Sequence, residues 1–226
     1  MLVTPRGFFE RDPVEVAPEL LGRLVVSGGV TVRLTEVEAY RQDDPASHSF
    51  RGPTARTAVM FGRAGHLYVY FTYGMHFCGN LTCGPVGFGA AVLLRAGEVV
   101  GGVEVARERR GERVAFRDLA RGPARLAQAM GWDRSDDGVD MVGAVSDGSG
   151  PVEVACGPRT GIMRAAEVPW RFWIAGDRFV SPYRRHPKAS SLFEFHVEQF
   201  RGHEVAVGLE RVGVGVDFGV SAFGVG

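Results

Sequence analysis

The alternation of apolar and polar residues predicts a short helix and then a β-hairpin near the N-terminus. Residues 14–22, VEVAPELLG, have helical apolar spacing and end on a glycine, which is typical of a short helix with a glycine stop. Residues 24–26, LVV, and 30–40, VTVRLTEVEAY, are rich in the β-branched residues that favour strands. Ser-Gly-Gly separates these two segments, so we expect them to pair as a hairpin.

A second group of strand patterns follows a long polar stretch. Residues 66–83, HLYVYFTYGMHFCGNLTC, alternate and carry many aromatic side chains, and residues 90–96, AAVLLRA, are typical of a buried strand. The intervening residues 41–64 are rich in Pro, Asp, Ser and Gly, with one turn of helix expected around TARTAVM. Because this loop is long for a plain connection, a functional role is favoured.

Helical spacing then takes over before strand patterns return. Residues 102–111 and 116–131 place apolar residues on one helical face and arginines on the other. Strand patterns return in VEVACG at 152–157 and VPWRFWIAG at 168–176. The order of sheet, helices and sheet predicts a mixed α/β (α+β) fold with a mainly antiparallel sheet.

The C-terminal stretch differs from the rest of the chain. It ends in GLERVGVGVDFGVSAFGVG, whose glycine density opposes regular structure. We therefore predict one functional domain over residues 1–188, followed by an accessory or poorly ordered extension over 189–226.

Composition and charge narrow the class of protein. The 226 residues are 45% hydrophobic and 23% charged, as in soluble globular domains, and the formal net charge is zero. Any polyanion partner must therefore be bound by a local basic patch. The N-terminus shows no secretory pattern, so we expect an intracellular, cytoplasmic protein and a monomer. Cys78, Cys83 and Cys156 are irregularly spaced, which favours inert thiols over a disulfide or zinc framework; no metal is expected.

Candidate chemistry begins at the end of the strand over 30–40, in the stretch EAYRQDDPASH. Glu38 at such a position is most often a solvated surface group. If it is instead partly buried beside aromatic rings, its raised proton affinity would suit general-base work on water. Asp43 and Asp44 beside Pro45 are interpreted as turn residues.

The aromatic segment at 66–77 allows two interpretations. Tyr68, Tyr70 and the neighbouring phenylalanines can form an ordinary core, or they can form a stacking platform for a flat heterocycle such as a nucleobase. Tyr73-Gly74 is typical of a turn with an exposed aromatic at its tip, and such a ring can wedge into a base stack. Asn80 and Arg95, in otherwise apolar strands, are either satisfied structural groups or binding residues.

The ordered series of segments resembles one enzyme family. VEAY, ASHSFRGPTARTAVMFGRAGHLYVYFTYGMHFCGN, AAVLLRA, RGPARLAQAMG, GPRTGI and PWRFW together resemble the alkyladenine DNA glycosylases, the monofunctional 3-methyladenine DNA glycosylases, from about residue 8 to 183. This resemblance implies a single mixed α/β domain with an antiparallel core and a protruding, DNA-intercalating β-hairpin.

The resemblance also implies roles for individual residues. Glu38 matches the acid that activates water, and Tyr73 matches the tyrosine that fills the gap left in the duplex. The flipped base would be enclosed by Tyr40, His48 and Tyr70, although the loop before His48 is one residue shorter than the family pattern. Asn80 matches the residue that screens against the amino group of guanine, and Arg95 an arginine at the pocket and DNA backbone.

We therefore expect a repair enzyme that releases alkylated or deaminated purines from duplex DNA by hydrolysing the N-glycosidic bond, without a cofactor. Of the 26 Lys and Arg residues only Lys188 is a lysine, and it lies far from the other candidates, so we expect no lyase step. Candidate phosphate contacts are Arg51, Arg56, Arg63, Arg121, Arg125, Arg159 and Arg164. Two alternatives stay open: a damaged-DNA binding module without turnover, and a nucleoside or formyl-type small-molecule enzyme on the same fold.

Overall fold

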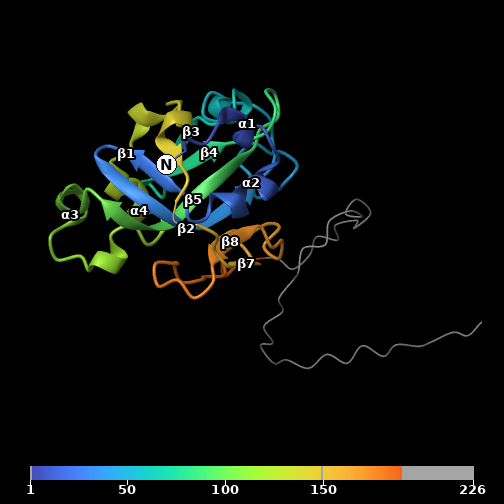
Figure 1. The fold of residues 1–226 in the computed structure, drawn as a ribbon. Helices are drawn as coiled ribbons and strands as arrows, with labels where there is room; N and C mark the ends of the chain where they lie inside the picture. The colour runs from blue at the N-terminus through green and yellow to red at the C-terminus, as the bar shows by residue number, and fades with distance from the viewer. Residues whose placement is uncertain (1, 149, 190–226) are drawn as a thin grey trace, which may run out of the picture. The chain divides into compact units, whose positions relative to one another are not determined.

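The computed structural model describes residues 2–148 and 150–189, so nearly all of the predicted extension over 189–226 lies outside the described residues. The elements appear in mixed order along the chain (Figure 1). They are α1 (Arg6–Phe9), α2 (Pro13–Leu20), β1 (Leu24–Ser27), β2 (Val30–Tyr40), β3 (Leu67–Thr72), β4 (His76–Thr82), β5 (Ala91–Gly101), α3 (Val103–Arg110), α4 (Pro123–Met130), β6 (Val145–Ser146), β7 (Val154–Gly157) and β8 (Arg171–Ile174), with 3-10 turns at Ala58–Phe61, Phe116–Asp118, Arg134–Asp136 and Val142–Ala144.

An antiparallel sheet forms the core, in the order β3-β4-β5-β2-β1-β6, and the mixed α+β class is confirmed. β2 lies at its centre, because β5 pairs along one edge while β1 and β8 share the other. β7 pairs with β8, which lies beside the second half of β2 (Figure 1). The end of β2 is therefore surrounded by strands from both halves of the chain.

β2 does not follow the simple alternation of a half-exposed strand. Every residue from Leu34 to Ala39 is buried, so both faces of this stretch are covered. The pairing with β5 also shifts register on both sides of Glu36, as β-bulges do. Two acids, Glu36 and Glu38, are thereby placed inside the protein rather than at its surface.

The helices cover the sheet, and α2 begins and ends where the sequence indicates. Asp12 caps α2 by accepting the Val14 N–H at 2.8 Å, and Gly22 follows its end with φ 80°. α4 packs on β4 and β5, and α3 packs beside α4. The helical pattern over 116–131 is wrong in its first half: a 3-10 turn occupies Phe116–Asp118, and α4 begins only after Gly122.

Two hairpins in the structure confirm the predicted pairing. Gly28 and Gly29 join β1 to β2 with φ of 55° and 78°, the left-handed conformation that a tight type I′ turn requires at both central positions. Tyr73, Gly74 and Met75 join β3 to β4, and the first two also have positive φ.

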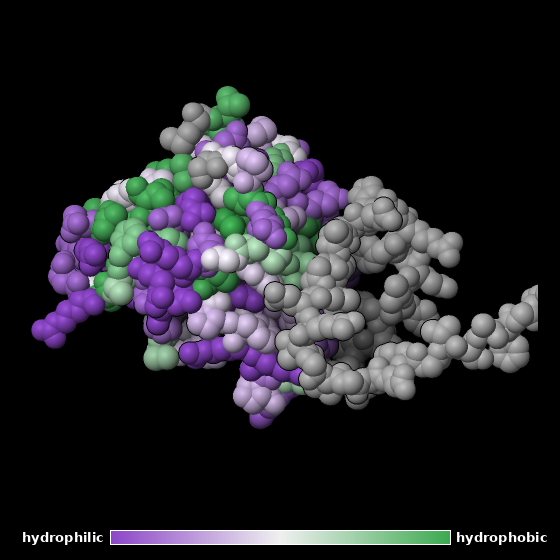
Figure 2. Space-filling view, turned by 60° about the horizontal axis from the view of Figure 1, so that its bottom comes forward, coloured by the Kyte–Doolittle hydropathy of each residue, from purple (hydrophilic) through white to green (hydrophobic). Residues whose placement is uncertain are grey.

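The surface of the described chain is mixed in character. Hydrophilic and apolar residues are interspersed on the face shown in Figure 2, in keeping with a formal net charge of zero. Among the described residues no helix is long and apolar enough to span a membrane.

Candidate active site

Side chains from both halves of the chain converge on one cavity of about 430 Å³. It is lined by β2, the loop after β2, the β3–β4 hairpin, β5, the first residues of α4 and residues 160–162. Seven of the residues singled out from the sequence line it: Glu38, Tyr40, His48, Tyr70, Tyr73, Asn80 and Arg95. The structure therefore brings this whole set together.

Glu38 lies at the buried end of the cavity and is fully removed from solvent. Its Oε1 accepts the Thr160 N–H at 2.7 Å and lies 3.3 Å from Nη1 of Arg95. Its Oε2 accepts the Tyr40 hydroxyl at 2.8 Å. Tyr40 lies two residues further along β2 and so on the same face. Burial and the charge of Glu38 raise the pKa of Tyr40 well above its usual value, so the phenol remains a donor.

Behind Glu38 lies a second buried acid, Glu36, which the sequence pattern did not single out. Its Oε1 accepts Nε of Arg95 at 2.9 Å and Nε of Arg171 at 2.7 Å, and its Oε2 accepts the Ser181 N–H at 2.7 Å. Burial favours the neutral carboxyl, but the two arginines and the Ser181 bond outweigh it and lower the pKa of Glu36. Two acids and two arginines thus form a compensated cluster in the interior.

The aromatic wall of the cavity comes from β3 and from the loop after β2. The Tyr68 and Tyr70 rings stack with centroids 5.9 Å apart, and the His48 ring meets Tyr70 edge-on at 4.6 Å. Nδ1 of His48 lies 3.1 Å from the Tyr68 hydroxyl. Although His48 keeps an exposed edge, enclosure by these rings and the nearby charge of Arg56 lower its pKa to about 4. The imidazole is therefore neutral at physiological pH.

Asn80 and Cys78, on β4, complete the wall beside the tyrosines. The Asn80 amide is buried and donates to the Tyr68 carbonyl at 3.0 Å, which fixes its orientation. Burial raises the pKa of the Cys78 thiol, so this group is an unreactive thiol. All three cysteines of the chain are free.

At the opposite end of the cavity, Tyr73 stands at the tip of the β3–β4 hairpin. It is 82% exposed, and its neighbour Met75 is 68% exposed. The prediction of an exposed aromatic at this turn is confirmed. The hairpin thus presents two large side chains to the solvent at the mouth of the cavity.

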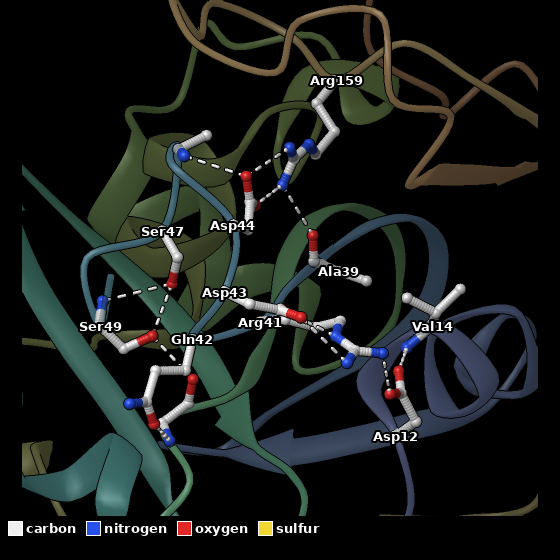
Figure 3. A network of polar contacts seen from close by, with 12 residues as sticks. Asp12, Val14, Ala39, Arg41, Gln42, Asp43, Asp44, Ser47, Ser49 and Arg159 are labelled. Atoms are coloured by element: carbon white, nitrogen blue, oxygen red, sulfur yellow. Dashed lines mark hydrogen bonds and ion pairs between the residues drawn. The ribbon is translucent and has the colours of Figure 1, made fainter. Parts of the chain in front are cut away.

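The loop after β2 is held by a network of polar contacts (Figure 3). Ser49 Oγ donates to the Gly89 carbonyl at 2.7 Å and lies 2.7 Å from Ser47 Oγ, and the Gln42 side chain accepts the Gly89 N–H at 3.0 Å. These contacts tie both sides of His48 to the strand connection before β5. The loop is therefore anchored although it has little regular structure.

Two sequence-based interpretations are corrected, one for Asp44 in this loop and one for Arg159 between β7 and β8. Asp44 does form a turn contact, accepting the Ala46 N–H at 2.9 Å, but it is also buried and paired with Arg159. Arg159, a candidate phosphate contact, has no exposed side-chain surface. Its guanidinium is taken up by Asp44 and by backbone carbonyls, so no phosphate can reach it.

The other arginine candidates fall into two groups. Arg51, Arg56, Arg63, Arg125 and Arg164 are exposed, and Arg121 is partly buried with its Nε donating to the Val180 carbonyl at 2.7 Å. Arg95 lies at the cavity but is buried, so its predicted contact with the DNA backbone is not supported by its position.

Comparison with known proteins agrees with this geometry. The sequence model of the family described as Methylpurine-DNA glycosylase matches residues 7–178. The chain belongs to this family. It is 52% identical over 195 residues to a Streptomyces avermitilis protein and 49% identical over 199 residues to one from Leifsonia xyli, both named "Putative 3-methyladenine DNA glycosylase". These alignments cover 80% of this chain and 92% and 93% of the relatives.

Within this methylpurine-DNA glycosylase family member, three residues at the site or its supports carry no prediction from the sequence: Glu36, Thr160 and Arg171. Asp44 and Arg159, predicted as a turn residue and a phosphate contact, instead form a buried pair beside the site. The one sequence feature that could have indicated Glu36 is the pair of acids two residues apart in a hydrophobic strand. Thr160 acts through its backbone N–H, for which side-chain identity gives no signal.

Proposed function

We propose that this protein releases alkylated or deaminated purines from duplex DNA by hydrolysing the N-glycosidic bond. The observation that carries the proposal is a buried carboxylate, Glu38, at the closed end of an aromatic cavity whose mouth bears an exposed tyrosine on a hairpin. A base must leave the stack to enter such a cavity, and enzymes that act on bases extrude them into pockets of this kind.

In the proposed reaction Glu38 takes a proton from a water molecule, whose oxygen attacks C1′ of the sugar as the bond to the base breaks. The bonding electron pair leaves with the base, so a cationic alkylated purine leaves neutral, whereas hypoxanthine leaves as an anion and takes up a proton from solvent. The carboxylate also offsets positive charge on the sugar in the transition state. The donors from Thr160, Tyr40 and Arg95 fix the orientation of its two oxygens.

The cavity wall suits a flat, electron-poor base. Tyr40, Tyr70 and the neutral His48 offer π faces and no positive charge, which favours a cationic purine by cation–π attraction. Asn80, held against the Tyr68 carbonyl, would exclude the exocyclic amino group of guanine by lack of room. A damaged or mispaired base also costs less to extract than a normal pair.

Tyr73 would enter the duplex and occupy the space that the flipped base leaves. The exposed Arg51, Arg56 and Arg63 come from the loop that lines the cavity and would contact phosphates. Lys188 is exposed, and it is not among the residues that line the cavity. We therefore propose base release without strand cleavage. We further propose that the enzyme is a monomer and acts on chromosomal DNA in the cytoplasm.

A damage panel tests this function. Duplexes that carry 3-methyladenine, hypoxanthine or 1,N6-ethenoadenine are incubated with excess protein, and strand breaks are scored with and without hot alkali. We expect breaks only after alkali, and no covalent adduct under borohydride. Release of the same bases from free nucleosides at an equal rate, or no release from any duplex, would refute the proposal.

A further inference from the structure

We propose that the buried Asp44–Arg159 ion pair is a clamp that positions Glu38 and Tyr40 for base release. This inference rests on the proposed function and concerns residues that do not themselves line the cavity. The side chain of Arg159 is 0% exposed and that of Asp44 is 1% exposed. Such a pair in the interior needs a reason beyond surface charge pairing.

Arg159 joins three separate segments of the chain, and two of these contacts, with Asp44 and with Ala39, can be followed in Figure 3. Both terminal nitrogens bind the Asp44 carboxylate in the loop after β2. Nη1 also donates to the Ala39 carbonyl at 3.1 Å, at the end of β2, and Nη2 to the Ala165 carbonyl at 3.4 Å. A planar guanidinium can make this set of contacts at once, whereas a lysine amine is a single point charge.

The same guanidinium contacts the group that holds one oxygen of Glu38. Its central carbon lies 4.7 Å from the centroid of the Tyr40 ring and 5.3 Å from that of Trp170. These are cation–π distances, so Arg159 fixes the plane of the Tyr40 ring. Tyr40 in turn donates its hydroxyl to Glu38 Oε2.

The other oxygen of Glu38 depends on Arg159 through the backbone. Thr160 follows directly in the chain, and its N–H donates to Glu38 Oε1 at 2.7 Å. Displacement of Arg159 would therefore disturb two of the donors to Glu38 at once, leaving Arg95 as the other. Asp44 shapes the turn that leads to His48, because its side chain and carbonyl accept the N–H groups of Ala46 and Ser47.

A positioning role and a folding role predict different behaviour for one double variant. Replacing a buried ion pair by apolar side chains is often neutral or stabilising. Asp44→Leu/Arg159→Met should therefore fold. It should nevertheless lose the guanidinium contacts with the Ala39 carbonyl, the Ala165 carbonyl and the Tyr40 ring. We expect the double variant to unfold at a temperature near that of the wild type and to release base slowly.

The test compares this double variant with Arg159→Lys and with the matched control Arg33→Met, which removes an arginine paired to Glu98 and Asp177 outside the cavity lining. Single-turnover base release should fall on the order of 100-fold in the double variant, since small misplacements of reacting groups have effects of that size. The DNA concentration giving half the maximal rate should change by less than about 3-fold, because the groups that bind DNA remain. Arg159→Lys should recover part of the rate, and Arg33→Met should retain the wild-type rate.

Hydrogen exchange at the Thr160 amide gives a second measurement that needs no catalysis. We expect faster exchange in the double variant and unchanged exchange in Arg33→Met, because the bond to Glu38 opens more often. If the wild type releases no base, the proposed function fails and this exchange rate alone decides on the clamp. A folded double variant with wild-type exchange, or with the wild-type release rate, would overturn it. If the double variant does not fold, Arg159→Lys and Asp44→Asn are judged by the same two measurements.

Discussion

The two ends of the cavity are opposite in character, although both belong to one site. At the closed end lies Glu38, with Glu36 behind it, and both acids have no exposed surface and are held by arginines and backbone N–H groups. At the open end, Tyr73 is an apolar ring that is 82% exposed. Each arrangement is unfavourable by itself, since burying charge and exposing a large aromatic both cost free energy. In the proposed function, the closed end serves chemistry and the open end serves contact with DNA.

The largest expected effect comes from breaking the closed end. Glu36→Leu leaves Arg95 and Arg171 buried without their shared carboxylate, so we expect a loss of about 3–5 kcal/mol in the free energy of unfolding. Urea denaturation measures this loss. Tyr73→Ser is the matched change at the open end, where we expect a change within about 0.5 kcal/mol because the side chain has few packed neighbours. Equal losses in the two variants would remove the structural contrast.

At the open end the expected loss is in activity instead. Tyr73→Ser should lower single-turnover release from duplex DNA by about 10-fold, because a ring stacked on bases contributes about 1–3 kcal/mol. Tyr73→Phe is the control, since it retains the ring and should keep most of the rate. If both variants release base at the wild-type rate, Tyr73 does not act as a wedge.

A smaller effect concerns pH. The pKa of His48 is about 4 in the folded protein, below the value near 6.5 of an unfolded histidine. The unfolded chain then binds more protons between these values, so this group makes the folded protein less stable as pH falls from 6.5 toward 4. We expect His48→Gln to show a shallower pH dependence of the free energy of unfolding in that window. An identical slope in the variant would contradict a neutral, enclosed imidazole.

The smallest expected effect is on the salt dependence of DNA binding. Arg51→Gln should reduce the slope of log binding constant against log salt concentration by about one, as loss of one phosphate contact does. Arg113, exposed beyond the end of α3, is the matched control and should leave the slope unchanged when replaced by Gln. The reverse result would place the DNA on a different face.

The open end could be predicted from sequence more fully than the closed end. The hairpins, the exposed position of Tyr73 and the antiparallel class follow from alternation and turn residues, which are local signals. The burial of Glu36 and Glu38 depends on Arg95, Arg171 and Ser181, which reach them from far along the chain. Alternation cannot show this, because bulges interrupt the register of β2 and both of its faces are covered.

Arg159 illustrates the same limit in a single residue. Its type and its place in GPRTGI are compatible with a phosphate contact, and only the fold shows that Asp44, 115 residues away, takes up its charge. The chain contains many arginines, and their positions in the sequence do not show which of them are buried and which are exposed. Long-range partners, rather than local pattern, decide which charges are available to a ligand.

We propose that Glu38 activates the attacking water, and a comparison of wild type with Glu38→Gln is the decisive test of this role. Single-turnover release of 3-methyladenine and hypoxanthine from duplex DNA is measured together with binding of the same duplexes. We expect the variant to bind like the wild type and to release base on the order of 10²–10⁴ times more slowly, the usual contribution of a general base. Equal release rates in the two proteins would show that Glu38 does not activate the water.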